Sequence, residues 1–266
     1  MSNLTALFLN RIGYTSTTEQ GQHETITFEK LPRILELAST SIPFENLRVL
    51  TNRTRDITRE HLIEDILIHN EGGICYELNA LFYLFLIDNG FDAAFTRAII
   101  YDNEAKEYIA WGRTHVTILL KHEGQTYLVD AGVGGNVPLN PVPLTGETVT
   151  STNGEFRVTK VEHELGDCVY EIKLKHKDTD WHINYIFDST MLLSDLAECT
   201  EVQQIVVEHP DSHFNKGPLI TKLTSTGNVT LTGSSFTKWE NGVVTKDKID
   251  DESFSKLLQE HFGLKQ

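Results

Sequence analysis

A single cysteine stands in the stretch GGICYELN, residues 72–79, where an apolar helical pattern begins. A thiol in the first turn of a helix faces unpaired backbone N–H groups and the positive end of the helix dipole, and both stabilise a thiolate. Gly72 and Gly73 allow a tight turn and leave space for a substrate to approach. Because most free cysteines are simply small buried side chains, Cys75 is a candidate nucleophile only if a base lies near it.

A histidine and an aspartate stand at the two ends of a predicted β-hairpin. His115 opens the run HVTILL and Asp130 closes the run YLVD, with a turn at residues 123–124. An even-length loop places Thr117 opposite Asp130, so His115 becomes a diagonal neighbour of Asp130 on the same face, whereas an odd loop separates them. The carboxylate can then fix the tautomer of the imidazole and leave the second ring nitrogen for a thiol. We therefore predict a catalytic set of Cys75, His115 and Asp130.

Two further histidines and an aspartate have the spacing of metal ligands. His209, Asp211 and His213 lie within five residues, but Pro210 places them in a loop and no further ligand is evident. Stable metal sites usually need three or four protein ligands held in a fixed geometry. We therefore predict no metal.

The elements that would position these residues change in character along the chain. Helical spacing of apolar residues covers the first third, and from Phe91 short β-rich runs separated by Gly, Asn and Asp indicate an antiparallel barrel or curled sheet. The order of helices, sheet and a small mixed segment predicts an α+β fold. The expected helices are 28–38, 58–70, 75–90, 194–207 and 251–262, and the expected turns of a late meander are 227–228 and 241–242.

Composition limits the class of protein. A chain of 266 residues can form two or three subdomains, and a formal net charge of -15 argues against nucleic acid or an anionic membrane as partner. We see no signal peptide and no apolar run near the roughly 18 residues that span a bilayer. The three widely spaced cysteines suit reduced thiols, so we expect a cytoplasmic protein; the oligomeric state stays open.

With these residues in view, the chain resembles the arylamine N-acetyltransferase family almost from end to end. The resemblance rests on FLNRIGY, IPFENL, GGICYELN, THVTILL, YLVDAGVGG and HPDSHFNKGPLITKL, which follow one another in the family's order. It implies a cysteine-protease-like catalytic core in four segments. These are an N-terminal helical bundle with the nucleophile (1–90), a central antiparallel β-barrel (91–190), an interdomain helix (191–207) and a C-terminal α/β lid (208–266).

The resemblance also implies an activity and a set of contacts. It implies acetyl-CoA as the co-substrate, arylamines or arylhydrazines as acceptors, and Cys75, His115 and Asp130 as nucleophile, base and orienting acid. Phe44 and Val133 fall where the family lines its acceptor pocket. The positions that correspond to CoA contacts are Thr114, Gly134, Ser212 and Phe214.

The chemistry itself suggests a ping-pong reaction. A thiolate that attacks a thioester stores the acetyl group on the cysteine, and an amine then discharges it while the histidine takes its proton. Phe44, Tyr76 and Phe95 would suit an aromatic acceptor, although each can equally belong to the core. The cations that could bind CoA phosphates are, by segment, Arg97, Arg113, Lys216, Lys222 and Lys238.

One residue departs from the family motif. Glu71 stands where the family has arginine, and an unpaired carboxylate near Cys75 would disfavour its thiolate. If Glu71 pairs with a cation from another segment, the site is preserved, and we expect Glu71→Arg to change activity less than tenfold. Two alternatives stay open: a Cys-His-Asp amide hydrolase or transglutaminase-like enzyme, and a catalytically quiet protein that binds acyl-CoA or an aromatic ligand.

Overall fold

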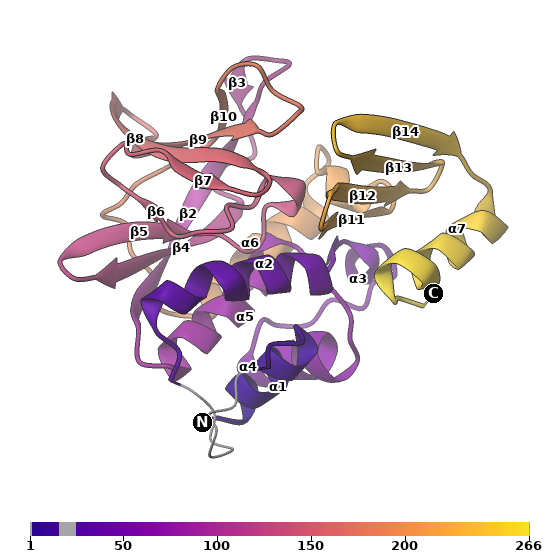
Figure 1. Ribbon diagram of the computed structural model, residues 1–266, viewed down its shortest axis with the longest axis horizontal. Helices are drawn as coiled ribbons and strands as arrows, with labels where there is room; N and C mark the ends of the chain where they lie inside the picture. The colour runs from indigo at the N-terminus through magenta and orange to yellow at the C-terminus, as the bar shows by residue number, and fades with distance from the viewer. Residues whose placement is uncertain (1, 16–24, 266) are drawn as a thin grey trace.

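The computed structural model describes residues 2–15 and 25–265. Figure 1 shows the N-terminal helices in its lower part, a large sheet at upper left and a smaller sheet at upper right. The two sheets have nine and five strands. The predicted α+β fold, with N-terminal helices and a central antiparallel barrel, is confirmed.

The N-terminal part consists of short helices around one central helix. Helix α5 is buried at every position from Cys75 to Leu86, because its sequence is apolar on all sides rather than on one stripe. It packs against α1 on one side and against β2 and β4 of the large sheet on another. The helices of this part are α1 (Asn3–Arg11), α2 (Leu31–Ser41), α3 (Leu47–Leu50), α4 (Arg59–Leu62) and α5 (Cys75–Asp88).

Two short helical turns extend these helices. A 3-10 turn at Phe28–Lys30 leads into α2, and a π-helical turn at Ile63–Ile68 continues α4. The predicted helices 28–38 and 58–70 are therefore present as composite elements.

The large sheet is antiparallel throughout, in the order β6-β5-β4-β2-β10-β9-β8-β7. Strand β6 also packs beside β8, which nearly closes the sheet into a barrel. Its strands are β2 (Asp92–Asp102), β4 (His115–His122), β5 (Gln125–Val129), β6 (Val142–Pro143), β7 (Val149–Ser151), β8 (Gly154–His163), β9 (Gly166–Leu174) and β10 (His182–Phe187), and β3 (Glu107–Tyr108) pairs with β2.

The β4–β5 hairpin has the even-length loop that the sequence predicted. Ile118 pairs with Val129 and His122 pairs with Gln125, so two residues form the loop. Those residues, Glu123 and Gly124, have φ angles of 47° and 78°, as expected for the tight hairpin turn whose twist matches the strands. This register places His115 and Asp130 on the same face.

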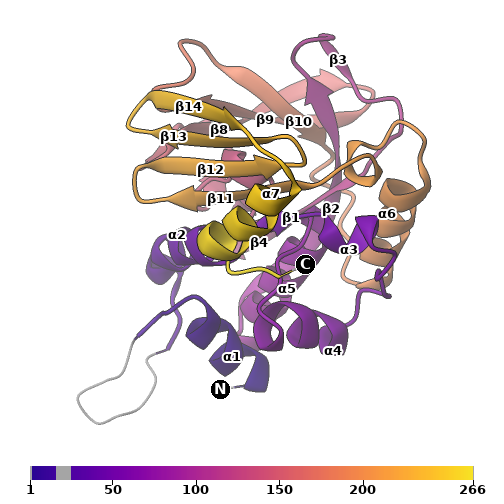
Figure 2. The same ribbon diagram turned by 90° about the vertical axis from the view of Figure 1, so that its right-hand side faces the viewer.

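We call the five-stranded sheet the lid sheet. It is formed by β11 (Leu219–Thr224), β12 (Gly227–Thr232), β13 (Ser235–Glu240) and β14 (Val243–Lys248), with β1 (Phe44–Glu45) at its edge. The N-terminal strand β1 was not predicted, and it pairs antiparallel with β11. Helix α7 (Asp251–Leu257), continued by a π-helical turn at Leu258–Phe262, packs against β12 and lies in front of the lid sheet in Figure 2.

One predicted turn is wrong. Gly227 and Asn228 belong to β12, and the turn comes two residues earlier, at Ser225 and Thr226. A Cβ atom on Gly227 would lie 1.8 Å from the carbonyl oxygen of Trp239, so this glycine allows two strands to approach rather than the chain to turn. The other turn, at residues 241–242, is confirmed.

Helix α6 (Ala197–Glu208) lies between the barrel and the lid sheet in the chain and packs against α5. Its predicted start at residue 194 is three residues early. Within residues 2–15 and 25–265, the chain has no helix with the length and apolar character needed to cross a lipid bilayer.

Candidate active site

Cys75 is the first residue of α5, as predicted, and it is 5% exposed. Glu77, two residues later, accepts a hydrogen bond through Oε2 from the backbone N–H of Ile74 at 2.8 Å, which fixes the start of the helix. The Cys75 sulfur lies 3.6 Å from the carbonyl oxygen of Thr114. Thr114 directly precedes β4, so the thiol lies at the beginning of the strand that carries His115.

The structure brings the predicted histidine and aspartate into contact. Nε2 of His115 lies 2.6 Å from Oδ2 of Asp130, and both side chains are buried. The Cys75 side chain is near enough to the imidazole to contribute to the raised pKa of His115. Since Nε2 is committed to Asp130, Nδ1 is the ring nitrogen left for sulfur. Cys75, His115 and Asp130 therefore form one connected set at the junction of α5 and the barrel.

Asp130 is surrounded by hydrogen-bond donors. Its Oδ1 accepts from Nδ2 of Asn79 at 2.9 Å and from the backbone N–H of Gly132 at 2.9 Å. Its Oδ2 accepts from the Tyr185 hydroxyl at 2.8 Å in addition to His115. Burial would raise the pKa of Asp130, but the positive charge of His115 and these donors outweigh it and hold the pKa below its usual range. The carboxylate is therefore stable without solvent.

The same contacts determine the charge of the imidazole. Burial lowers the pKa of His115, but the adjacent Asp130 charge and hydrogen bond, with a smaller contribution from Cys75, outweigh it and raise the pKa to about 10. At neutral pH the ring therefore carries two protons and a positive charge. A cation in this position stabilises negative charge on the neighbouring sulfur.

Glu71 is paired with cations from another segment, which answers the doubt that the sequence raised. Its Oε2 lies 2.6 Å from Nη1 of Arg48 and its Oε1 lies 3.1 Å from Nη1 of Arg53. Arg48 is buried, and it also binds Oε1 of Glu77 at 2.6 Å and the carbonyl oxygen of Gly72 at 2.9 Å. The charge at position 71 is inverted relative to the family motif, and Arg48 supplies the cation.

The loop before Cys75 is clamped to residues 43–45. The backbone of Gly73 bonds to Pro43 and Glu45, and the N–H of Gly72 donates to Oε1 of Glu45 at 3.2 Å. A Cβ atom on Gly72 would lie 2.2 Å from the carbonyl oxygen of Pro43, so this close approach requires glycine. Burial raises the pKa of Glu45 to about 7, although Arg48 and the Leu47 N–H oppose the shift.

Three of the positions implied by the family resemblance, Phe44, Phe214 and Gly134, meet at this clamp. Phe44 and Phe214 are half-buried and meet edge to face, with ring centroids 5.9 Å apart. Asn46 donates to the carbonyl oxygens of Phe214 and Gly217, both at 2.8 Å, and so joins the clamp to the segment after α6. Gly134 lies against the Phe44 ring.

The other implied positions and the remaining aromatic candidates are half-buried or fully buried. Val133 is half-buried and packs among Val137, Leu139 and Leu223. Ser212 is fully buried, and its hydroxyl has no partner among the described residues. Of the aromatic candidates for an acceptor ring, Tyr76 and Phe95 are fully buried in the core, and only Phe44 is partly open.

The cations proposed from the sequence have different environments. Arg97 lies 3.4 Å from Glu198 and from Glu201, and Arg113 donates to the Leu165 carbonyl at 2.6 Å. Lys222 and Lys238 lie over aromatic rings of the lid, and Lys216 is exposed.

Sequence reasoning missed three residues that hold the site. In the sequence, Asn79 stands one helical turn after Cys75, on the same side of the predicted helix. Arg48 directly follows IPFENL. Tyr185 could be found only from the alternation of HINYIF, which points every second side chain into the barrel.

Comparison with known proteins gives consistent matches. A family model described as N-acetyltransferase matches residues 27–266. The uncharacterized acetyltransferase YvcN of Bacillus subtilis is 37% identical over 238 residues, covering 89% of this chain and 91% of its own. The arylamine N-acetyltransferase NAT3 of Bacillus cereus, described as having a unique Cys-His-Glu catalytic triad, superposes with a TM-score of 0.92 at 34% identity and complete coverage of both chains.

A more distant structure shares the fold. The arylamine N-acetyltransferase of Mycobacterium marinum, solved in complex with CoA, has a TM-score of 0.81 at 24% identity, over 97% of this chain and 92% of its own. In the present chain the side chain that binds the histidine ring is Asp130, where the Bacillus cereus protein is described with glutamate.

Proposed function

This chain belongs to the arylamine N-acetyltransferase family and is an acyltransferase, and from that premise we propose that it acetylates arylamines and arylhydrazines from acetyl-CoA through an acetyl-cysteine at Cys75. The observation that carries the proposal is the connected set of Cys75, His115 and Asp130. The buried imidazole is bound to the carboxylate through Nε2, and the nearby Cys75 side chain contributes to its raised pKa.

The first half-reaction moves the acetyl group to sulfur. Cys75 reacts as a thiolate, with its proton held by the positively charged His115, and attacks the thioester carbonyl carbon of acetyl-CoA. The carbon–sulfur bond to CoA breaks, and His115 gives its proton to the departing CoA thiolate. The products are S-acetyl-Cys75, free CoA and neutral His115. One thioester replaces another, so this step is close to balanced in energy.

The second half-reaction delivers the acetyl group to an amine. An arylamine is a weak base, so it is uncharged and nucleophilic at neutral pH. Its nitrogen attacks the acetyl carbon, neutral His115 takes one proton from that nitrogen, and the Cys75 sulfur leaves as a thiolate. The amide is released, and His115 is again protonated beside the thiolate. Asp130 remains a carboxylate throughout and keeps the ring oriented.

Support for the donor and acceptor comes from the relatives and from the surroundings of the thiol. The Mycobacterium marinum relative has been solved with CoA, and the Bacillus cereus relative is an arylamine N-acetyltransferase. The half-buried Phe44 and Phe214 rings offer an aromatic surface for an arylamine.

Burial raises the pKa of the Cys168 thiol to about 11, so this second cysteine stays protonated and does not compete with Cys75 for the acetyl group.

The test is to weigh the intact protein after incubation with acetyl-CoA. We expect one added acetyl group, located on Cys75 by peptide mapping, and its loss when aniline is then added, with acetanilide as product. Cys75→Ala should gain no acetyl group, whereas the matched control Cys168→Ala should gain one.

Other results would contradict the proposal in different ways. Binding of acetyl-CoA without a change of mass would favour the quiet binding protein. Hydrolysis of amides without any acetyl-enzyme would favour the hydrolase. Formation of acetanilide by Cys75→Ala would show that the amine attacks acetyl-CoA directly.

A further inference from the structure

Asn46 stands at the N-cap of α3 but does not cap this helix. An asparagine at an N-cap usually accepts a hydrogen bond from the first turn of its own helix. Here the side chain forms no such bond, and Oε2 of Glu45 accepts from the Leu47 N–H at 2.6 Å instead. Asn46 is 1% exposed, so its buried amide has to find its partners in another part of the chain.

The Asn46 side chain forms three hydrogen bonds to the backbone of residues 214–219. Its Nδ2 donates to the carbonyl oxygens of Phe214 and Gly217, both at 2.8 Å, and its Oδ1 accepts from the Leu219 N–H at 2.8 Å. Only a side-chain amide offers two donors and an acceptor in so short a side chain. Asn46 therefore fixes the backbone of the segment that carries the Phe214 ring and leads into β11.

The residues before Asn46 connect this segment to the nucleophile. Phe44 forms a β-bridge with Gly73, and the Glu45 N–H donates to the Gly73 carbonyl oxygen at 3.0 Å. Gly73 stands two residues before the nucleophile in the sequence. Residues 44–46 therefore join the loop that carries the thiol to the segment that Asn46 holds.

The rings of Phe44 and Phe214 meet where the two held segments come together. Their centroids are 5.9 Å apart and their planes are inclined by 60°. Both rings are half-buried, and both pack against the core cluster that contains Cys75. Because Asn46 fixes the backbone of Phe214, this ring keeps one position relative to Phe44.

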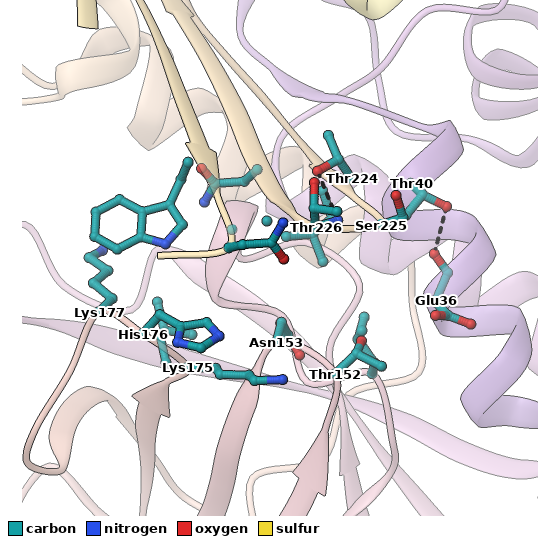
Figure 3. Close-up of a pocket in the computed structure, with 18 of the residues that line it drawn as sticks. Glu36, Thr40, Thr152, Asn153, Lys175, His176, Lys177, Thr224, Ser225 and Thr226 are labelled. Carbon is teal, nitrogen blue, oxygen red and sulfur yellow. Dashed lines mark hydrogen bonds between the residues drawn. The ribbon is translucent and has the colours of Figure 1, made fainter. Parts of the chain in front are cut away.

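The cavity at the other end of β11 has a different chemistry. Its volume is about 590 Å³, and Figure 3 shows polar side chains on its walls, among them Asn153, His176 and Thr226. Among the described residues that line it, none comes from residues 44–46 or 209–217. The ring of an aromatic amine is apolar, so the surface that suits it is the pair of half-buried phenylalanine rings rather than this cavity.

We propose that Asn46 is a positioning residue for acceptor choice, which fixes Phe214 opposite Phe44 and so determines which aromatic amines reach the acetyl group on Cys75. This inference rests on the proposed function, because it assumes an acetyl-cysteine that an amine discharges. Asn46 acts through the Phe214 ring and touches neither substrate nor the reacting atoms. When its amide is removed, the ring can turn aside, and the space beside Phe44 admits a longer aromatic amine.

The test is a competition between two acceptors. Aniline and 4-aminobiphenyl, which differ in length but little in basicity, are supplied together with acetyl-CoA, and the two amide products are separated by chromatography. Both amines draw on the same acetyl-Cys75, so the product ratio depends neither on the rate of acetylation nor on the fraction of folded protein. In Asn46→Ser we expect this ratio to shift roughly fivefold toward the 4-aminobiphenyl product, as for the loss of one aromatic contact.

A matched control comes from the far end of α5. Asn89 directly follows this helix, whereas Cys75 begins it. Its Nδ2 donates to the Phe85 carbonyl oxygen at 2.7 Å and to Oγ1 of Thr5 at 3.0 Å. Asn89→Ser should lower the thermal stability without shifting the product ratio. An equal shift in both variants would overturn the proposal, because acceptor choice would then follow stability.

A second variant tests whether Asn46 acts through the ring. Phe214→Leu removes the ring but leaves the partners of the Asn46 side chain in place, since these are backbone atoms. We expect the product ratio to shift in the same direction, and we expect the double variant Asn46→Ser/Phe214→Leu to add less than twofold to that shift. Fully multiplicative effects would overturn the proposal. An unchanged ratio in Phe214→Leu would overturn it even if Asn46→Ser did not fold.

An unchanged ratio in Asn46→Ser would also overturn the proposal, because the three hydrogen bonds would then serve stability alone. Failure of the proposed function is visible separately, because the wild type would then form neither amide.

Discussion

Two groups of charged side chains flank Cys75, and they are built differently. The Asp130 cluster pairs one carboxylate with one imidazole and completes it with neutral donors from Asn79, Tyr185 and a backbone N–H. The Arg48 cluster sets three carboxylates, those of Glu45, Glu71 and Glu77, around a single buried arginine. The first is closed to solvent, whereas Glu71 in the second is 23% exposed and also contacts Arg53.

The two clusters therefore have different roles. In the Asp130 cluster the donors hold the carboxylate in the position that orients the His115 ring, so the loss of one donor affects catalysis. In the Arg48 cluster the charges hold the backbone before Cys75, so what matters is that each buried charge has a partner. The inversion at position 71 fits the second role, since Arg48 restores the pairing from another segment.

The largest expected effect on activity comes from Asp130→Asn. The amide keeps the shape of the side chain, but it can donate to Nε2 of His115 and so favours the wrong tautomer. We expect kcat/KM for acetyl-CoA to fall about 10³–10⁴-fold, as for the equivalent change in a serine protease triad. Steady-state kinetics measure this, with Asp167→Asn, a half-exposed aspartate paired with Lys160, as the control. A loss below tenfold would show that Asp130 does not orient the ring.

The next largest effect is expected from Arg48→Met, which should lower the stability of the folded protein. It leaves Glu77 buried without its cation, and we expect the free energy of unfolding to fall by about 3–5 kcal/mol. Urea denaturation measures the change. Arg53→Met, which removes a 55% exposed partner of Glu71, should cost less than about 1 kcal/mol. Equal losses in the two variants would contradict a central role for Arg48.

Glu45 in the Arg48 cluster should make the stability of the protein depend on pH. Burial raises the pKa of Glu45 from 4.5 to about 7, so between these values the folded protein holds a proton that the unfolded chain has lost. Stability contributed by this group is present below pH 4.5 and is lost as pH rises through 7, by roughly 1–3 kcal/mol. Glu45→Gln should flatten the free energy of unfolding over this range. An unchanged slope would assign it to other groups.

A smaller effect is expected from Tyr185→Phe. The variant removes one of the two donors to Oδ2 of Asp130 and leaves His115 in place. We expect kcat/KM to fall roughly three- to tenfold, in line with about 1 kcal/mol for one hydrogen bond. Tyr170→Phe is the matched control, because its hydroxyl donates to the Asn136 carbonyl rather than to Asp130. A similar loss in both variants would indicate a packing effect of the barrel.

The smallest effect is expected from Glu71→Arg, which we predict to change activity less than tenfold. Arg48 keeps Glu77 and the Gly72 carbonyl as partners, and the new side chain can extend to solvent from a partly exposed position. Initial rates with acetyl-CoA and aniline measure it. A larger loss would show that the Arg48 cluster tunes the chemistry as well as the backbone.

Local pattern was enough to predict the parts of the site that depend on neighbouring residues. The start of α5 at Cys75 follows from a helical pattern after two glycines, and the contact of His115 with Asp130 follows from strand alternation and a two-residue turn. These inferences need only the periods of helix and strand.

Contacts between distant segments were not predictable in the same way. The pairing of Phe44 with Thr221 and the pairing of Arg48 with Glu71 depend on how whole segments pack. A two-residue strand has no periodicity to read, and Gly227 resembled a turn residue because close strand approach also demands glycine.

The pairing of β1 with β11 has a consequence for the order of events during synthesis. The segment that clamps the loop before Cys75 lacks its neighbouring strand until residues 219–224 have been made. Closing a contact between residues 44 and 221 is entropically costly and slow. A nascent chain that already contains Cys75, His115 and Asp130 should therefore stay inactive on the ribosome, and the thiol should become reactive only after the lid strand has emerged.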